Sequence, residues 1–300
     1  MGPSIYLKKC ATHCDQERRE QTMFTIVLCL KTTTHRQDID SVDRFVRIGL
    51  ASYKKNLRVP DVAEFIVITP PKERALIQTR LEQEAPEFPW TFVSENDVVE
   101  STLPQGWAKQ QTAKLAIARR VKTPIYLLVD DDTFAVRPFG GDDLYHNSTL
   151  RMNTTSIDFP FFFLWSSEVL GADYEALVQP QPFHMAITPE VFVTSVVRDI
   201  LKTLETRHGT QWQKAIVHNK FTEYGVYWIY LLMQNKTSLY ATDAPLYAGA
   251  TTSPDHVLAE QLKVAFDTER SSHIFSFVQT SLPISTDAIE EGLLAFESKT

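Results

Sequence analysis

The sequence is poor in cysteine, and what cysteine it has forms no recognisable set. Three cysteines, Cys10, Cys14 and Cys29, are too few for a disulfide framework. Cys10 and Cys14 lie near His13, but the spacing matches no complete zinc set because a fourth ligand is missing. We therefore expect free thiols in a reducing compartment.

Long apolar runs and an excess of basic charge are also absent. The longest apolar runs, such as Val226–Met233, fall far short of the roughly 20 residues that a membrane-spanning helix needs. The net charge of −7 argues against a nucleic acid held mainly by counterion release. We expect neither a transmembrane segment nor a nucleic-acid partner.

The first 22 residues differ in composition from the rest of the chain. They are polar and charged and contain no apolar signal core, so we expect a flexible N-terminal arm and a cytoplasmic location. Three glycosylation sequons begin at Asn147, Asn153 and Asn235, but they carry little weight without a signal peptide. The chain is 43% hydrophobic, ample for a packed core, and we expect residues 23–300 to form one domain.

The most informative stretch is an apolar strand that runs into three carboxylates. Ile125–Val129 reads as a short buried strand of a parallel sheet, and Asp130, Asp131 and Asp132 follow it directly. A hard divalent cation such as Mg²⁺ or Mn²⁺ resolves the repulsion between adjacent carboxylates. Ligands of open α/β sheets bind at the carboxyl ends of the strands, so we expect a metal there, holding a phosphate-bearing ligand.

Two alternatives to that metal site were considered, and only the second fits the residues. An EF-hand calcium loop fails, because Phe134 and Val136 stand where oxygen ligands are needed and Gly141 ends the loop. A solvated acidic turn, with Asp130 capping a local element and Arg137 neutralising a neighbour, is consistent with these residues.

The first half of the chain alternates between strand and helix patterns. This alternation predicts a mainly parallel sheet flanked by helices, that is, an α/β fold. Loops after the first strand and after Val129 then face one ligand from two sides, as suits a nucleotide. The expected strands are Thr25–Leu30, Phe65–Ile68, Trp90–Val93 and Ile125–Val129; the expected helices are Asp38–Tyr53, Glu73–Gln83 and Gly106–Arg120.

One lysine stands out on the helix before the acidic strand. Lys114 lies among Ala113, Leu115 and other apolar residues, with Gln110 one turn earlier on the same face. The ordinary explanation is a lysine whose stem lies on apolar surface while its ammonium reaches solvent. The functional alternative is a lysine that reaches a diphosphate.

Several motifs, taken together, resemble a known family. Trp107–Leu115 contains Gln-Gln-x-x-Lys-Leu, and Asp130–Thr133 is an Asp-x-Asp-Thr motif followed by Arg-Pro-Phe. A Phe-His-Met stretch at 183–185 and a Glu-Tyr-x-x-Tyr helix from Glu223 come later in the same order. The region from Phe24 to Tyr247 thereby resembles nucleotide-sugar glycosyltransferases of the GT-A fold, in particular a bacterial and viral type.

This resemblance implies roles for individual residues. It implies Asp130 and Asp132 at a Mn²⁺ or Mg²⁺ ion, with Asp131 nearer the nucleotide or donor sugar. It also implies a further metal ligand near the C-terminus, for which His273 is the first candidate and His256 the second. The nucleoside and donor would meet the residues Lys31, Thr32, Thr33, Gln110 and Lys114.

The second half of the chain is expected to bind the acceptor, with the nucleotide-sugar half ending near residue 139. The aromatic run Phe159–Trp165 is expected to pack in the core, and the alternative is that some of its rings line an acceptor pocket. Further helices are expected at 189–204, 224–234, 256–268 and 287–296, and a strand at 274–278.

Glu223 has a structural and a catalytic interpretation. As a structural residue it is an acid in the first turn of a helix, favoured by the helix dipole. As a catalyst it is the general base that deprotonates the acceptor hydroxyl for inversion at the anomeric carbon, with Asp158 and Asp173 as reserves.

The expected activity is therefore transfer of a sugar, from a UDP-sugar by preference, to a hydroxyl of a glycan acceptor. The first alternative is a nucleotidyltransferase of related fold, which would carry a glycine-rich phosphate loop, whereas 31–36 contains no glycine. The second is a non-catalytic module that holds Ca²⁺ on the acidic turn.

Overall fold

A computed structural model describes residues 23–32, 40–104, 106–156, 161–178, 183–217, 221–253, 257–267 and 272–297. The expected arm at 1–22 lies outside these residues, as do Thr33, Asp158 and His256. Among the helices described, none is long and apolar enough to cross a membrane.

The centre of the molecule is a five-stranded sheet in the order β10-β4-β1-β2-β3. Strands β1, β2, β3 and β4 are parallel, and β10 is antiparallel to β4. The mixed, mainly parallel α/β fold is therefore confirmed. The strands are β1 Phe24–Cys29, β2 Val62–Thr69, β3 Trp90–Ser94, β4 Ile125–Val129 and β10 Glu190–Val193.

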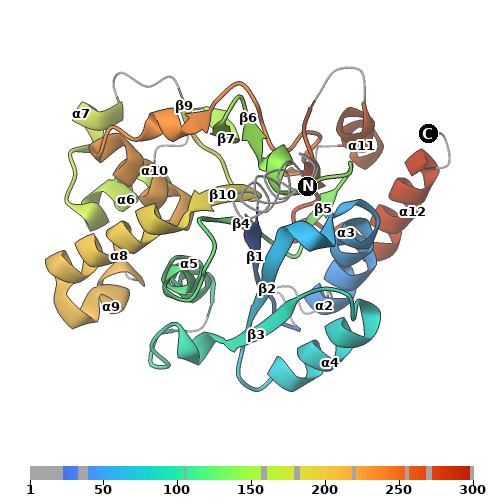
Figure 1. Cartoon of the computed structure of the whole chain (residues 1–300), viewed down its shortest axis with the longest axis horizontal. Coiled ribbons are helices and arrows are strands. Elements are labelled where there is room, and N and C mark those ends of the chain that lie inside the picture. Colours follow the sequence, from blue (N-terminus) through green and yellow to red (C-terminus); the bar gives the residue numbers. More distant parts are fainter. Residues whose placement is uncertain are drawn as a thin grey trace, which may run out of the picture.

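Helices cover both faces of this sheet (Figure 1). In that view α3 and α12 lie to the right of the sheet, while α5, α8 and α10 lie to its left. The helices of the first half are α2 Ser41–Arg44, a π-helical turn η1 Phe45–Leu50, α3 Ala51–Asn56, α4 Arg74–Glu84 and α5 Trp107–Ala116. Those of the second half are α6 Phe161–Leu170, α7 Tyr174–Val178, α8 Thr194–His208, α9 Trp212–Val217, α10 Glu223–Met233, α11 Leu258–Phe266 and α12 Thr286–Glu297.

Short strands that follow β4 in the chain build three small sheets. They pair β12 with β5, β8 with β9, and β11 and β6 with β7. Their bounds are β5 Thr133–Ala135, β6 Tyr145–His146, β7 Thr149–Arg151, β8 Thr154–Ser156, β9 Phe183–Met185, β11 Tyr240–Ala241 and β12 Phe275–Phe277. Short 3₁₀ turns complete the chain at η2 Val59–Asp61, η3 Glu95–Asp97, η4 Ile117–Arg119, η5 Gly141–Leu144, η6 Gly209–Gln211 and η7 Thr237–Leu239.

The helix expected at 189–204 begins later than predicted. Residues 190–193 form strand β10, which pairs with the edge of β4, and α8 begins only at Thr194. Val191, Phe192 and Val193 are β-branched or aromatic and favour a strand when an open sheet edge is available. Pro189 precedes the strand, where its missing N–H breaks no ladder hydrogen bond.

The prediction that the aromatic run packs in the core also needs correction. Phe163 is buried, but Phe161 and Phe162 are exposed over 62% and 41% of their surface. Core packing therefore holds for only part of this run.

Candidate functional site

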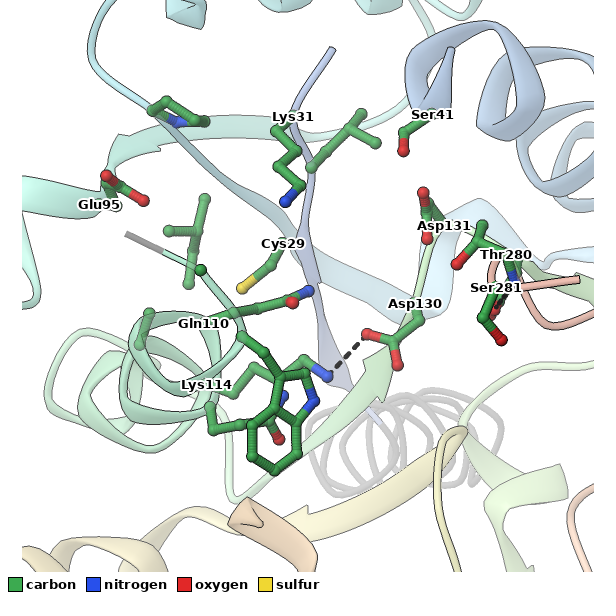
Figure 2. Close-up of a pocket in the computed structure, with 18 of the residues that line it drawn as sticks. Cys29, Lys31, Ser41, Glu95, Gln110, Lys114, Asp130, Asp131, Thr280 and Ser281 are labelled. Atoms are coloured by element: carbon green, nitrogen blue, oxygen red, sulfur yellow. Dashed lines mark hydrogen bonds and ion pairs between the residues drawn. The ribbon is translucent and has the colours of Figure 1, made fainter. Parts of the chain in front are cut away.

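A cavity of about 320 Å³ opens at the carboxyl ends of β1 and β4. Figure 2 shows the side chains that converge on it. Two strand-end loops therefore face one space, as the sequence predicted. The wall contains Cys29 at the end of β1 and Lys31 after it, the three aspartates after β4, and the residues Ser41, Glu95, Trp107, Gln110, Gln111, Lys114, Gln279, Thr280 and Ser281.

The three aspartates direct their carboxylates to different partners. Asp130 Oδ1 lies 2.7 Å from Lys114 Nζ. Asp131 points toward Ser41, which donates a hydrogen bond to it (Figure 2). Asp132 Oδ2 accepts from the backbone N–H of Thr280 at 3.1 Å. This divergence lowers the repulsion expected of three neighbouring carboxylates.

Burial and mutual repulsion still leave an excess of negative potential at this turn. Burial raises the pKa of Asp131 to about 6, although the hydrogen bond from Ser41 opposes the shift. Burial raises the pKa of Asp132 well above its ordinary value, and the charges of Asp131 and Asp130 add to that effect. Arg137 Nη2 donates to the carbonyl oxygen of Asp267 at 2.8 Å. A cation would relieve this potential.

Lys114 is buried rather than directed to solvent, so the ordinary interpretation of this residue was wrong. Only 1% of Lys114 is exposed, and its Nζ lies 2.8 Å from Glu223 Oε1 as well as 2.7 Å from Asp130. Burial lowers the pKa of Lys114, but the two carboxylates outweigh that effect and hold it well above its ordinary value. Lys114 therefore carries a fixed positive charge beside the acidic turn.

Glu223 lies behind Lys114 and is not part of the cavity wall. It is the first residue of α10, whose N-cap Thr222 accepts from the N–H of Gly225 at 2.8 Å. The carboxylate is fully buried. When the amide of Gln111 is oriented with its nitrogen toward Glu223, it donates to that carboxylate, and its oxygen accepts from Trp107 Nε1 at 3.3 Å. Burial raises the pKa of Glu223, and Lys114 opposes that shift.

The donor residues suggested by the resemblance separate into two groups. Lys31, Gln110, Lys114 and Asp131 all line the cavity. Thr32 does not, and its backbone N–H donates to Glu73 Oε2 at 2.5 Å.

His273 lies away from the acidic turn. It precedes Phe275, which pairs with Ala135, whereas Asp132 lies at the opposite end of β5. Its ring Nε2 is 2.7 Å from the carbonyl oxygen of Ala265. The structure therefore does not bring this histidine to Asp130 and Asp132. The reserve base Asp173 is exposed and accepts from the N–H of Ala176 at 3.2 Å, as a helix cap does.

Sequence reasoning missed the C-terminal wall of the cavity. Gln279, Thr280 and Ser281 reach it because β12 pairs antiparallel with β5, so that the chain after Phe277 passes Asp132. No local motif marks these residues, because their position depends on pairing across more than a hundred residues of sequence. Ser41 could have been suspected as a hydroxyl near the loop after β1.

The side chains at the turn fit a hard cation in kind. Asp130 and Asp132 supply carboxylate oxygens, which are the preferred ligands of Mg²⁺ and Mn²⁺. Within the described part of the chain, no three His, Cys, Asp or Glu side chains gather into a complete protein-only site. The remaining ligands would have to come from water or from a phosphate, as is usual for Mg²⁺.

Comparison with solved structures defines the class of fold. The apo form of mouse xyloside xylosyltransferase 1 matches with a TM-score of 0.52 and 9% identity, over 87% of this chain and 99% of that chain. The galactosyltransferase LgtC, in complex with donor and acceptor sugar analogues, matches with a TM-score of 0.46 and 11% identity, over 92% and 94%. The first of these likenesses, with the sheet order above, establishes a fold of the GT-A type.

The chain itself belongs to the family of unknown function DUF6492, whose profile matches residues 21–300. A search of curated proteins finds no match.

Proposed function

We propose that this protein is a metal-dependent glycosyltransferase that moves a sugar from a nucleoside-diphosphate sugar, preferably a UDP-sugar, to a hydroxyl of a glycan acceptor. The observation that carries the proposal is the cavity at the ends of β1 and β4, where Asp130, Asp132 and the charged Lys114 meet. A diphosphate is negatively charged and binds cations. The acidic turn can hold a divalent metal ion that also binds the diphosphate, and the ammonium of Lys114 adds a second positive charge beside it. The known activity of the mouse xylosyltransferase with the same fold supports this choice by analogy only.

In this proposal Asp130 and Asp132 hold Mn²⁺ or Mg²⁺. When bound, such an ion acts as a Lewis acid toward the charge on the departing nucleoside diphosphate. Lys114 adds a fixed positive charge at the same place, and Lys31 supplies a second one from the loop after β1. Gln110 contributes an amide to the wall between them.

For Glu223, the geometry supports a positioning role over direct proton transfer. Its buried carboxylate is 2.8 Å from Lys114 Nζ, and it does not line the cavity. We propose that Glu223 holds the ammonium of Lys114 beside Asp130. General-base catalysis by Glu223, with inversion, is the competing role, and without a base under the acceptor the reaction would follow a retaining course.

Calorimetry with UDP- and GDP-sugars, with and without Mn²⁺, tests the proposal directly. We expect binding that requires the metal, and turnover that disappears with EDTA and in Asp132→Ala. A protein that ignores all nucleotides would be a binding module, and one that prefers nucleoside triphosphates would be a nucleotidyltransferase. Either result would refute the proposal.

Glu223→Gln separates the two roles of this residue. Loss of turnover with unchanged donor affinity and unchanged pH dependence of donor binding would indicate the base. A positioning residue should instead weaken donor binding, because the neutral amide holds the ammonium of Lys114 less firmly than the carboxylate does.

A further inference from the structure

Helix α6 presents aromatic side chains on its outer face. Phe161, Phe162 and Leu164 are exposed over 62%, 41% and 38% of their surface, and Trp165 is half-buried. This is unusual for a helix of a soluble fold, where large exposed apolar groups in one place often mark a binding surface. The exposed aromatic face of α6 is therefore a candidate binding surface.

The rings form one continuous band that begins at the cavity. Trp107 belongs to the cavity wall, and its ring centroid lies 5.9 Å from that of Phe162. Phe162 lies 6.0 Å from Trp165, and Trp165 lies 6.1 Å from Phe161. We call these four side chains the aromatic ridge. Helices α5 and α6 lie on the same side of the sheet (Figure 1).

The opposite face of α6 fixes the ridge in place. A Cβ at Gly225 of α10 would fall against Ser166 Oγ and would lie 3.2 Å from the carbonyl oxygen of Phe162, so the two helices are in close contact. Phe163 stacks on His184 with 3.9 Å between ring centroids. Because α10 begins with Glu223, the same contact ties the ridge to the Lys114 cluster. These contacts hold α6 against α10 and His184, next to the cavity wall at Trp107.

We propose that the aromatic ridge binds the glycan acceptor, by stacking its rings on the apolar C–H faces of pyranose units. This inference rests on the proposed function, which supplies the donor in the adjoining cavity. Binding sites for small organic ligands are lined predominantly by hydrophobic and aromatic side chains. Continuity through Trp107 places an acceptor bound there at the mouth of the donor cavity.

The charge of α6 favours a neutral carbohydrate over a membrane surface. A helix that lies on anionic lipid carries Lys or Arg on its polar face. Helix α6 carries neither, and its one charged residue is the exposed Glu168. With a net charge of −7, the chain as a whole gains nothing from anionic lipid.

A glycan array with the full chain tests the inference. We expect the wild-type protein to bind a subset of bacterial or eukaryotic oligosaccharides. Affinity for the strongest hit, measured by ligand-observed NMR, should fall about tenfold or more in the double variant Phe162→Ala/Trp165→Ala. Phe162→Tyr/Trp165→Phe should retain binding, because it keeps the rings. Leu76→Ala, at an exposed leucine of α4, is the matched control and should bind like the wild type.

Thermal melting checks that the variants are folded, and calorimetry with UDP-sugars and Mn²⁺ checks the donor site. Unchanged donor binding in the double variant, with loss of glycan binding, supports the ridge as the acceptor site. Ridge-independent glycan binding, or no bound glycan, would overturn it while leaving the donor proposal intact. Ridge-dependent binding to vesicles of phosphatidylcholine and phosphatidylglycerol, or a ridge-dependent dimer in ultracentrifugation, would overturn it also. Ridge-dependent glycan binding without nucleotide binding would refute the transferase and keep the carbohydrate site.

Discussion

Replacing Lys114 with methionine should destabilise the protein strongly, because it leaves a buried carboxylate without its cation. Glu223 is fully buried, and Lys114 Nζ is its ion-pair partner at 2.8 Å. Removing one member of a buried pair costs on the order of 3–5 kcal/mol, since the other charge stays desolvated. We expect Lys114→Met to lower the free energy of unfolding by an amount in that range.

Glu223→Gln should cost less than Lys114→Met. The glutamine keeps a polar partner for Lys114, and the ammonium retains Asp130 at 2.7 Å. A loss of about 1–3 kcal/mol is expected from the weakened buried interaction. In the double variant Lys114→Met/Glu223→Gln, neither charge of this pair is left in the interior. The double variant should therefore be more stable than the sum of the two single losses implies, by roughly 1–3 kcal/mol.

Urea denaturation followed by tryptophan fluorescence measures all four proteins of this cycle. Lys122→Met, at an exposed lysine beyond the same helix, is the control and should change stability by no more than about 0.5 kcal/mol. Additive losses in the double variant, or a Lys114→Met variant as stable as the control, would refute the buried ion pair.

Three other perturbations test the surrounding packing. Gly225→Ala should cost about 1–3 kcal/mol in urea denaturation, since the new methyl falls against Ser166, and Ser166→Ala should restore part of the loss. Burial lowers the pKa of His184 to about 4 from an ordinary 6.5, so its protonation favours the unfolded chain. Stability should therefore fall as the pH drops from 6.5 toward 4, and melting curves of His184→Phe should depend less steeply on pH in that range. Asn153→Ala should cost about 3 kcal/mol or more, because this buried amide bonds three backbone groups, and a near-neutral variant would contradict that role.

Much of the fold could be predicted from local pattern alone. Continuous apolar runs predicted β1 and β4 within one residue, and the alternation of strands with helices predicted the parallel sheet. The position of Asp130–Asp132 at a strand end follows from the same pattern. Since parallel strands share one carboxyl edge, the meeting of the loops after β1 and β4 was also predictable.

Predictions from local sequence pattern failed where contacts with distant segments determine the environment of a residue. Residues 190–193 became a strand because the edge of β4 was open to them. The ordinary explanation for Lys114, an ammonium in solvent, was wrong because α10 covers this side chain and supplies the buried Glu223. The apolar run at 159–165 was expected in the core, yet the packing of α6 on α10 left part of its aromatic side facing outward.

The sequence by itself therefore determined the four parallel strands of the sheet, their order along the chain and the presence of carboxylates at its carboxyl edge. These properties depend on the periodic spacing of apolar residues and on residues that are adjacent in the sequence. Only the tertiary structure decided which charges are paired, which rings are exposed and that Thr280 bonds Asp132. Such contacts join residues far apart in the chain, and their energies depend on burial, which no local stretch of sequence specifies.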